Sequence, residues 1–98
     1  MFFLIQSVRY YMVKSNSWFV YILRCSDKTL YTGITTDVER RLIEHNSKKS
    51  VTKYTRARQP VEMVYKEEQD SRSNASKREA LIKTFSRVKK ELLIKENI

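Results

Sequence analysis

Aromatic and β-branched residues dominate the first strongly patterned segment, Trp18 to Leu23, which reads Trp-Phe-Val-Tyr-Ile-Leu. Such a run is typical of a buried β-strand. Residues 26–28 (Ser-Asp-Lys) have the composition of a turn. Residues 29–34 are therefore expected to form a second strand that pairs antiparallel with the first. A third strand is expected over residues 61–66, where apolar and polar residues alternate loosely.

Helical signals begin directly after the second strand. Residues 36–39 (Thr-Asp-Val-Glu) have the pattern of a capping box, with Thr36 as the N-cap of a helix that runs to about Asn46. On this helix Val38, Leu42 and His45 share one face, and Arg41 lies at its edge. We therefore expect Arg41 and His45 to point towards the sheet.

Two further helices are expected in the C-terminal third of the chain. A polar cluster at residues 70–73 starts one of them, and Ser86 is expected to cap a last helix over residues 87–95. Val88, Leu92 and Leu93 are expected to face inward. Residues 47–60 are polar and basic and are interpreted as a loop with room for one helical turn. These elements predict the α+β class: a small three-stranded antiparallel sheet flanked by helices.

The length of 98 residues suits one small domain, which we place at residues 17–96. Residues 1–16 show no clear period and are interpreted as an N-terminal extension, either packed on the domain or an artefact of a start site whose true beginning is Met12. The apolar start is too short for a signal peptide, and no run approaches the roughly 18 apolar residues of a membrane span. No membrane association is expected.

The chain is strongly basic, with 20 Lys and Arg against 11 Asp and Glu, a net charge of +9. An excess of this size favours a polyanionic partner through counterion release. Nucleic acid is the leading candidate, an anionic membrane surface is a weaker one, and charge that merely keeps the protein in solution is the alternative. The residues expected to contact the phosphate backbone lie in the basic segment: Lys48, Lys49, Lys53, Arg56 and Arg58.

Several kinds of chemistry find no support in the sequence. The single cysteine, Cys25, excludes an intrachain disulfide and fits a reducing cytoplasm; we interpret it as a strand residue. There is no Cys/His zinc pattern, no glycine-rich phosphate loop and no pair of close acidic residues for a two-metal site. No serine or cysteine nucleophile has a histidine at motif spacing.

Five side chains remain as candidates for phosphodiester chemistry. Tyr21 and Tyr31 lie on adjacent antiparallel strands and can approach each other on one face. Arg41 offers a planar fork for phosphate oxygens, and His45 is the only histidine. Glu79 is a carboxylate at the edge of an apolar helix face. Taken singly, each has a plain structural reading: core tyrosines, a solvated arginine, a helix-end histidine, and a glutamate paired with a lysine four residues on.

In combination these segments resemble the GIY-YIG nuclease family, in particular its small stand-alone bacterial members. The resemblance covers residues 17–95. It rests on Trp18 to Leu23, on Leu30-Tyr31-Thr32-Gly33-Ile34-Thr35, on Asp37 through Arg40-Arg41 to His45, and on Arg78-Glu79-Ala80-Leu81-Ile82-Lys83. The chain departs from the family pattern at three strand positions: Phe19 stands for the first-motif glycine, Val20 for its isoleucine, and Thr32 for the second-motif isoleucine.

The resemblance implies a role for each candidate residue. Tyr21 takes the place of the first-motif tyrosine, as the base or as the phenol that activates the nucleophile, and Tyr31 and Gly33 complete the second motif. Arg41 would stabilise phosphate charge and His45 matches the histidine one turn later. Glu79 matches the metal-ligand glutamate, so Mg²⁺ (or Mn²⁺) is the expected cofactor. Gly33, the only glycine, is expected where the backbone needs its freedom, at the close of the second strand.

The sequence therefore predicts a metal-dependent endonuclease that hydrolyses DNA, with a structure-directed role in repair or recombination as one form of that activity. Branched and single-stranded DNA are candidate substrates, and a protein partner is a candidate means of targeting. The alternatives are a non-catalytic nucleic-acid-binding module that keeps the fold, and a protein-interaction domain whose charge serves solubility.

Overall fold

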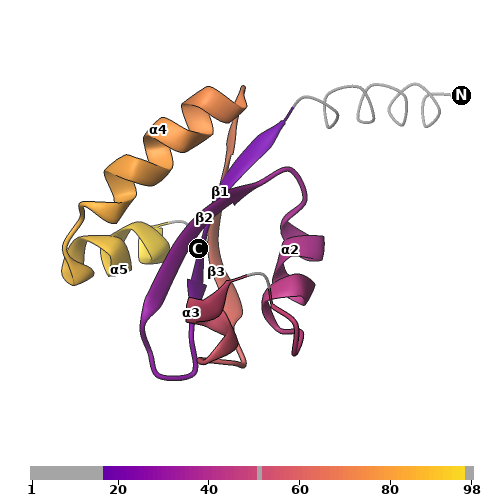
Figure 1. Cartoon of the computed structure of the whole chain (residues 1–98). Helices are drawn as coiled ribbons and strands as arrows, with labels where there is room; N and C mark the ends of the chain where they lie inside the picture. The colour runs from indigo at the N-terminus through magenta and orange to yellow at the C-terminus, as the bar shows by residue number, and fades with distance from the viewer. Residues whose placement is uncertain (1–16, 51, 97–98) are drawn as a thin grey trace, which may run out of the picture.

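Three antiparallel strands form the centre of the computed structural model, which describes residues 17–50 and 52–96 (Figure 1). They are β1 (Trp18–Arg24), β2 (Leu30–Thr35) and β3 (Glu62–Gln69). The strand order is β2-β1-β3, so β1, the strand with the longest buried run, lies in the middle. The predicted α+β architecture is confirmed.

The register of the strands decides which side chains share a face. β1 and β2 pair antiparallel, with Tyr21 opposite Gly33 and Ile22 opposite Thr32. β1 and β3 also pair antiparallel, but the register shifts between Ile22, which faces Tyr65, and Leu23, which faces Met63. This shift is a β-bulge, because two residues of β3 advance while β1 advances by one.

Helix α2 (Val38–His45) and the short helix α3 (Lys53–Arg56) follow β2 in the chain. The N-cap of α2 is Asp37 and not Thr36 as expected. Asp37 has extended backbone angles and its carboxylate accepts a hydrogen bond from the Arg40 backbone N–H at 3.1 Å. A carboxylate is a strong cap and also favours the positive end of the helix dipole. The helical turn expected within residues 47–60 is confirmed as α3.

Helices α4 (Arg72–Lys83) and α5 (Arg87–Glu96) complete the described chain. Ser71 caps α4, and the Ser86 hydroxyl accepts a hydrogen bond from the Lys89 backbone N–H at the start of α5, as expected. The expected inward face of α5 was wrong in part. Val88 and Leu92 are 69% and 52% exposed, whereas Leu93 packs on the core and Ile94 is buried.

The two pairs of helices cover opposite faces of the sheet (Figure 1). Helices α4 and α5 pack on the face that carries Val20 and Ile22, where they contribute Ala75, Ile82 and Ile94 to one core cluster. Helices α2 and α3 lie over the other face, where Tyr21 and Leu23 form a second cluster with Cys25, Val61 and partly buried neighbours. The central strand thus supplies both cores with alternate side chains.

The remaining expectations differ from the structure by small shifts. β2 begins at Leu30 and ends at Thr35, and β3 begins at Glu62 and ends at Gln69, which is longer than predicted. Cys25 lies just after β1, buried, with its backbone N–H bonded to the Thr29 carbonyl in the turn. The N-terminal extension proposed for residues 1–16 lies outside the described residues. In the described part of the chain, no helix is long and apolar enough to cross a membrane.

Candidate active site

Gly33 has a different role from the one expected. It lies within β2, directly opposite Tyr21, and its φ is not positive. A Cβ at this position would lie 2.5 Å from the Tyr21 hydroxyl oxygen and 2.7 Å from its Cζ. The absence of a side chain therefore leaves the space in which the Tyr21 phenol lies across the neighbouring strand. The second-motif glycine is required for a close approach, not for a turn.

The Tyr21 phenol is joined to the only histidine by a buried hydrogen bond. Its hydroxyl lies 2.8 Å from His45 Nε2, and His45 Nδ1 lies 2.8 Å from the Thr55 hydroxyl. Tyr21, His45 and Thr55 are all 0% exposed. The three residues come from β1, the end of α2 and α3, so a continuous polar chain passes through the core on this face of the sheet.

Burial sets the protonation state of both ring groups. It raises the pKa of Tyr21 to about 12, an effect that the nearby Arg41 guanidinium opposes. Burial also lowers the pKa of His45 to about 4, and the positive charge of Arg41 acts in the same direction. At neutral pH the site therefore holds a neutral phenol beside a neutral imidazole.

Arg41 lies beside this pair with part of its guanidinium unpaired. One terminal nitrogen donates to Glu44 at 3.0 Å, and Glu44 also binds the exposed Arg40, so one carboxylate holds both arginines. The Nε atom of Arg41 is buried and has no hydrogen-bond partner among the described residues. A buried, unpaired N–H of a charged group is costly unless a ligand oxygen accepts from it. As expected, Arg41 and His45 both point towards the sheet.

Tyr31 is the candidate phenol that reaches the surface. Unlike Tyr21, it is only partly buried. Its ring centroid lies 6.5 Å from that of Tyr21 and 5.2 Å from that of His45, in an edge arrangement. On its other side lies Tyr54 at 5.9 Å. Tyr31 therefore lies beside the buried chain and is partly accessible to solvent.

Glu79 lies on α4, which packs on the opposite face of the sheet. Its charge is near enough to raise the pKa of Tyr21, as the smallest of the effects on that phenol. Its side chain is 23% exposed, and one carboxylate oxygen lies 3.4 Å from Lys83 Nζ. The expected structural pairing with the lysine four residues on is therefore present. Among the described residues no group of three or more His, Cys, Asp or Glu could together hold a metal ion.

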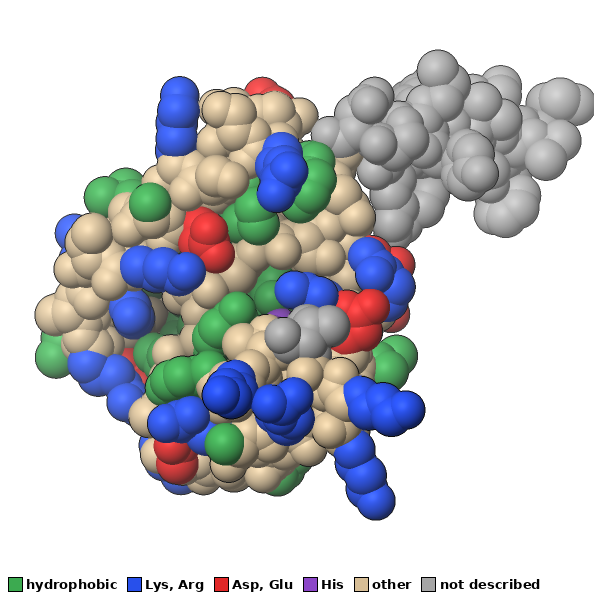
Figure 2. All heavy atoms as spheres, in the orientation of Figure 1, with side chains coloured by type: hydrophobic (Ala, Val, Ile, Leu, Met, Phe, Trp, Pro, Cys, Tyr) green, Lys and Arg blue, Asp and Glu red, His purple; other side chains and the backbone are tan. Residues whose placement is uncertain are grey.

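The segment expected to contact nucleic acid is exposed and basic, but two of its arginines have other partners. Lys48, Lys49 and Lys53 are exposed. Arg56 donates to the Ser50 carbonyl at 3.3 Å, whereas Arg58 pairs with Asp27 at 3.0 Å and lies 3.8 Å from the centre of the Tyr54 ring. Figure 2 shows Lys and Arg side chains gathered around α3, next to the hollow between the two pairs of helices.

Comparison with known proteins identifies the family to which the chain belongs. Residues 17–91 match the family described as the GIY-YIG catalytic domain. The chain belongs to this family. It is 54% identical to a UPF0213 protein of Desulfotalea psychrophila over 79 residues, which are 81% of this chain and 72% of that one. It is 58% identical to a UPF0213 protein of Syntrophus aciditrophicus, across 81% of this chain and 91% of the relative.

Two solved structures share the GIY-YIG fold with this chain. A UPF0213 protein of Bacillus halodurans, determined by NMR in solution, is 44% identical with a TM-score of 0.52, covering 81% of this chain and 83% of that chain. A protein of E. faecalis, also determined by NMR, is 43% identical with a TM-score of 0.56, covering 82% and 84%. The chain is thus a small member of a nuclease family, and the names of these relatives state neither a substrate nor a metal.

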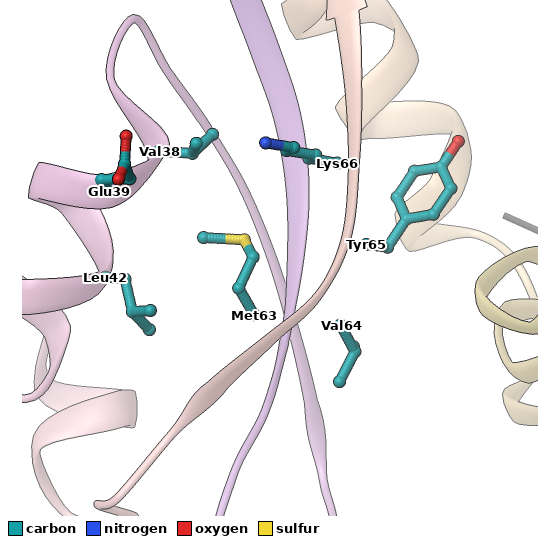
Figure 3. Close-up of a pocket in the computed structure, with 7 residues that line it drawn as sticks. All are labelled: Val38, Glu39, Leu42, Met63, Val64, Tyr65 and Lys66. Atoms are coloured by element: carbon teal, nitrogen blue, oxygen red, sulfur yellow. The ribbon is translucent and has the colours of Figure 1, made fainter. Parts of the chain in front are cut away.

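A groove of about 280 Å³ lies on the same GIY-YIG domain, apart from the motif residues (Figure 3). It runs between α2, which contributes Val38, Glu39 and Leu42, and β3, which contributes residues 63–66. Figure 3 shows Met63 directed towards Leu42 and Val38, and Tyr65 turned away. None of the candidate site residues lines this groove.

Sequence reasoning missed two residues that the structure brings to the motif. Glu44 holds Arg41, and its positions three and four residues after Arg41 and Arg40 are the spacing of helical ion pairs, which was a usable signal. Thr55, on the short helix α3, contacts His45, which lies ten residues earlier in the chain. The only sign of its role in the sequence is that Tyr54 and Thr55 interrupt an otherwise basic segment.

Proposed function

We propose that this chain is a metal-dependent endonuclease that hydrolyses phosphodiester bonds of DNA. The observation that carries the proposal is the position of Arg41, partly exposed and beside the buried Tyr21–His45 pair. An arginine that lacks one acceptor, a partly exposed carboxylate and a partly exposed phenol supply what phosphate recognition and hydrolysis need. Membership of a nuclease family supports the same reading.

Burial reassigns the roles of the two tyrosines. Tyr21 is 0% exposed and burial raises its pKa to about 12, so we propose that it is not the group that contacts the attacking water. Tyr31 is partly exposed and adjacent, so we assign it the contact with the attacking water. Tyr21 then serves as the buried support that sets the positions of His45 and Arg41. This proposal differs from the expectation that Tyr21 activates water directly.

Arg41 provides the fixed positive charge for the scissile phosphate. Glu44 holds one of its terminal nitrogens at 3.0 Å and the side chain is 28% exposed, so the guanidinium has little freedom to move. Such a preorganised donor stabilises charge that develops on phosphate oxygens without reorganising during the reaction. The exposed part of the side chain is where a phosphate oxygen would bind.

The residues present fit a single magnesium or manganese ion. Mg²⁺ often takes one or two protein carboxylates and completes its shell with water and substrate phosphate. Glu79 offers one partly exposed carboxylate, and one of its oxygens lies 3.4 Å from Nζ of the exposed Lys83. When bound, such an ion supplies positive charge that polarises the phosphate. Glu79 is the residue that would hold it.

The basic segment beside the site is proposed to bind the DNA backbone. Lys48, Lys49 and Lys53 are exposed near α3 and carry charge that phosphates can neutralise. Arg56 and Arg58 are proposed to support the segment through their contacts with Ser50, Asp27 and Tyr54. Branched and single-stranded DNA remain the proposed substrates. A cytoplasmic location and a targeting protein partner are proposed with them.

The decisive experiment incubates the full chain with branched, nicked, single-stranded and duplex DNA in Mg²⁺, Mn²⁺ or EDTA. Cleavage with a divalent ion and none in EDTA is expected. Tyr31→Phe should lower the single-turnover rate by roughly 10² to 10⁴, as for loss of an acid–base group. Glu79→Gln should abolish metal-dependent cleavage while DNA binding in EDTA persists.

The salt bridge between Glu79 and Lys83 is the observation that favours the second candidate, a nucleic-acid-binding module without catalysis. In that case wild type and Glu79→Gln would bind DNA equally, and neither would cleave any substrate with any metal. That outcome would overturn the nuclease proposal and leave the binding role.

A further inference from the structure

The buried chain at the candidate site ends in a group of hydroxyls that no motif includes. The Thr55 hydroxyl lies 2.8 Å from His45 Nδ1, 3.2 Å from the Ser50 hydroxyl and 3.3 Å from the Thr52 carbonyl. Thr55 is 0% and Ser50 is 3% exposed. Because this pocket is closed to solvent, the protons within it must be shared among the protein groups themselves.

A neutral imidazole carries one N–H, so the two bonds of His45 cannot both be donated. Either Nδ1–H donates to Thr55 and Nε2 accepts from the Tyr21 hydroxyl, or Nε2–H donates to Tyr21 and Nδ1 accepts from Thr55. The hydrogen bond made by one ring nitrogen decides whether the other nitrogen carries the proton. The two arrangements can be distinguished by following the proton of each hydroxyl.

In the second arrangement the Tyr21 hydroxyl proton has nowhere to go. The phenol oxygen would receive the Nε2–H of His45 on one side and face the positive Arg41 guanidinium on the other. Arg41 can only donate to the phenol oxygen, so it offers no acceptor for the Tyr21 proton. A buried donor without an acceptor is destabilising, because nothing replaces the hydrogen bond that it makes to water in the unfolded chain.

In the first arrangement every proton has an acceptor. Tyr21 donates to Nε2, Nδ1–H donates to the Thr55 oxygen, and the Thr55 hydroxyl donates to the Thr52 carbonyl at 3.3 Å, which can only accept. The lone pairs of the Tyr21 oxygen are then free to face Arg41. The chain of bonds runs in one direction, from the phenol beside the arginine to the backbone of the α3 cap.

We infer that Thr55 is a positioning residue that holds His45 as the Nδ1–H tautomer, and that it acts through His45 and Tyr21 on the placement of Arg41. Its consequence for cleavage rests on the proposed nuclease function, whereas the tautomer itself does not. Thr55 touches neither substrate nor metal in this account. It is the third member of a phenol–imidazole–hydroxyl chain. In other proteins, too, the group that binds the second ring nitrogen of a functional histidine fixes its tautomer and orientation.

The test uses the single histidine of the chain, whose imidazole gives one pair of ring-nitrogen signals. Long-range ¹H–¹⁵N correlation of the full-length protein at pH 7 should show Nδ1 protonated and Nε2 unprotonated. Thr55→Val, which keeps the shape but loses the acceptor, should move the signals towards the Nε2–H tautomer. Thr55→Ser should restore the wild-type pattern, and Ser50→Ala should leave it unchanged.

A wild-type spectrum with Nε2 protonated would overturn the inference without any variant. A Thr55→Val spectrum identical to wild type in a folded protein would overturn it as well. In cleavage assays Thr55→Val should lower kcat roughly tenfold with little change in KM, and Thr55→Ser should recover most of the rate. If wild type cleaves no DNA, the nuclease proposal fails while the spectra still decide the tautomer.

Discussion

At the scale of single residues, the pair Tyr21 and Gly33 shows how one missing side chain makes a site. The two residues face each other across β1 and β2, and the phenol occupies the volume that a Cβ on Gly33 would fill. The phenol is also held by His45, so it cannot move aside without breaking a buried hydrogen bond. The glycine and the tyrosine therefore act as one unit.

Gly33→Ala should accordingly destabilise the protein by about 1–3 kcal/mol, as overpacking does. It should also displace Tyr21 and reduce any cleavage. Melting temperature and chemical denaturation measure the first effect. The control is Gly33→Ala in a Tyr21→Ala background, where the space is open and the alanine should cost much less. Equal costs in both backgrounds would show that the two residues are not coupled.

His45 makes the stability of the protein depend on pH in a defined window. Burial, and then the charge of Arg41, lower its pKa from 6.5 to about 4, while Glu44 acts in the opposite direction. Between these two values the unfolded chain binds a proton that the folded chain does not. Stability is therefore complete above about pH 6.5 and falls as the pH drops towards 4, by up to about 3 kcal/mol.

An NMR titration of the His45 ring protons measures this shift directly, because no other histidine contributes. The midpoint should lie well below the ordinary histidine value. A midpoint near 6.5 in the folded protein would contradict the burial of the imidazole. Denaturation curves at pH 7 and pH 4.5 should then differ less in His45→Gln than in wild type.

At the scale of elements, helix α5 illustrates how an anchored face differs from an exposed one. Ile94 is 7% exposed and belongs to the core cluster under the sheet, whereas Leu92 is 52% exposed. Glu91 adds a polar anchor: both of its oxygens bind Arg24 of β1 at 2.7 and 2.9 Å, and this arginine lowers the pKa of Glu91 to about 2. The helix is fixed on one side only.

Ile94→Ala should therefore cost about 2–5 kcal/mol, the range for buried aliphatic truncation. Leu92→Ala, two residues away on the exposed side, should change stability by about 0.5 kcal/mol or less. Urea denaturation of both variants gives the comparison. Equal losses would mean that Leu92 is covered in solution, by another copy or by a part of the chain outside the described residues.

An element could be predicted from the sequence where its buried face is clearly distinct from its exposed face. β1 was predictable because a six-residue aromatic and aliphatic run can only be buried, and α2 because its apolar spacing is unambiguous. The face of α5 was not, since Val88, Leu92, Leu93 and Ile94 leave two stripes of similar apolarity. The motif residues of the site were predicted by resemblance, but Thr55 was not, because its contact depends on how a loop folds back.

At the scale of the whole molecule, the sheet brings together groups that the chain keeps far apart. His45 and Tyr21 are 24 residues apart and meet on one face, whereas Glu79 lies on α4, in the helix layer on the other face. The net charge of +9 belongs to the chain as a whole, so the total charge alone does not say which face meets a polyanion. The proposed site does, because it places the exposed lysines near α3 beside the motif residues.

This placement can be separated from overall charge with two triple variants. One replaces Lys48, Lys49 and Lys53 by alanine, and the control replaces the exposed Lys77, Lys89 and Lys95 of α4 and α5. Each lowers the net charge from +9 to +6, that is 9 − 3. Since each phosphate contact adds about 0.9 to the slope of log K against log salt, the first variant should lose up to about 3 from that slope.

Fluorescence anisotropy with labelled branched, single-stranded and duplex DNA in EDTA, at several salt concentrations, measures both slopes. The control variant should bind slightly more weakly than wild type but keep most of its slope, because its lysines lie away from the proposed track of the backbone. Equal losses in both variants would mean that DNA is held by diffuse charge. A greater loss in the control would move the DNA-binding face to α4 and α5 and away from the candidate site.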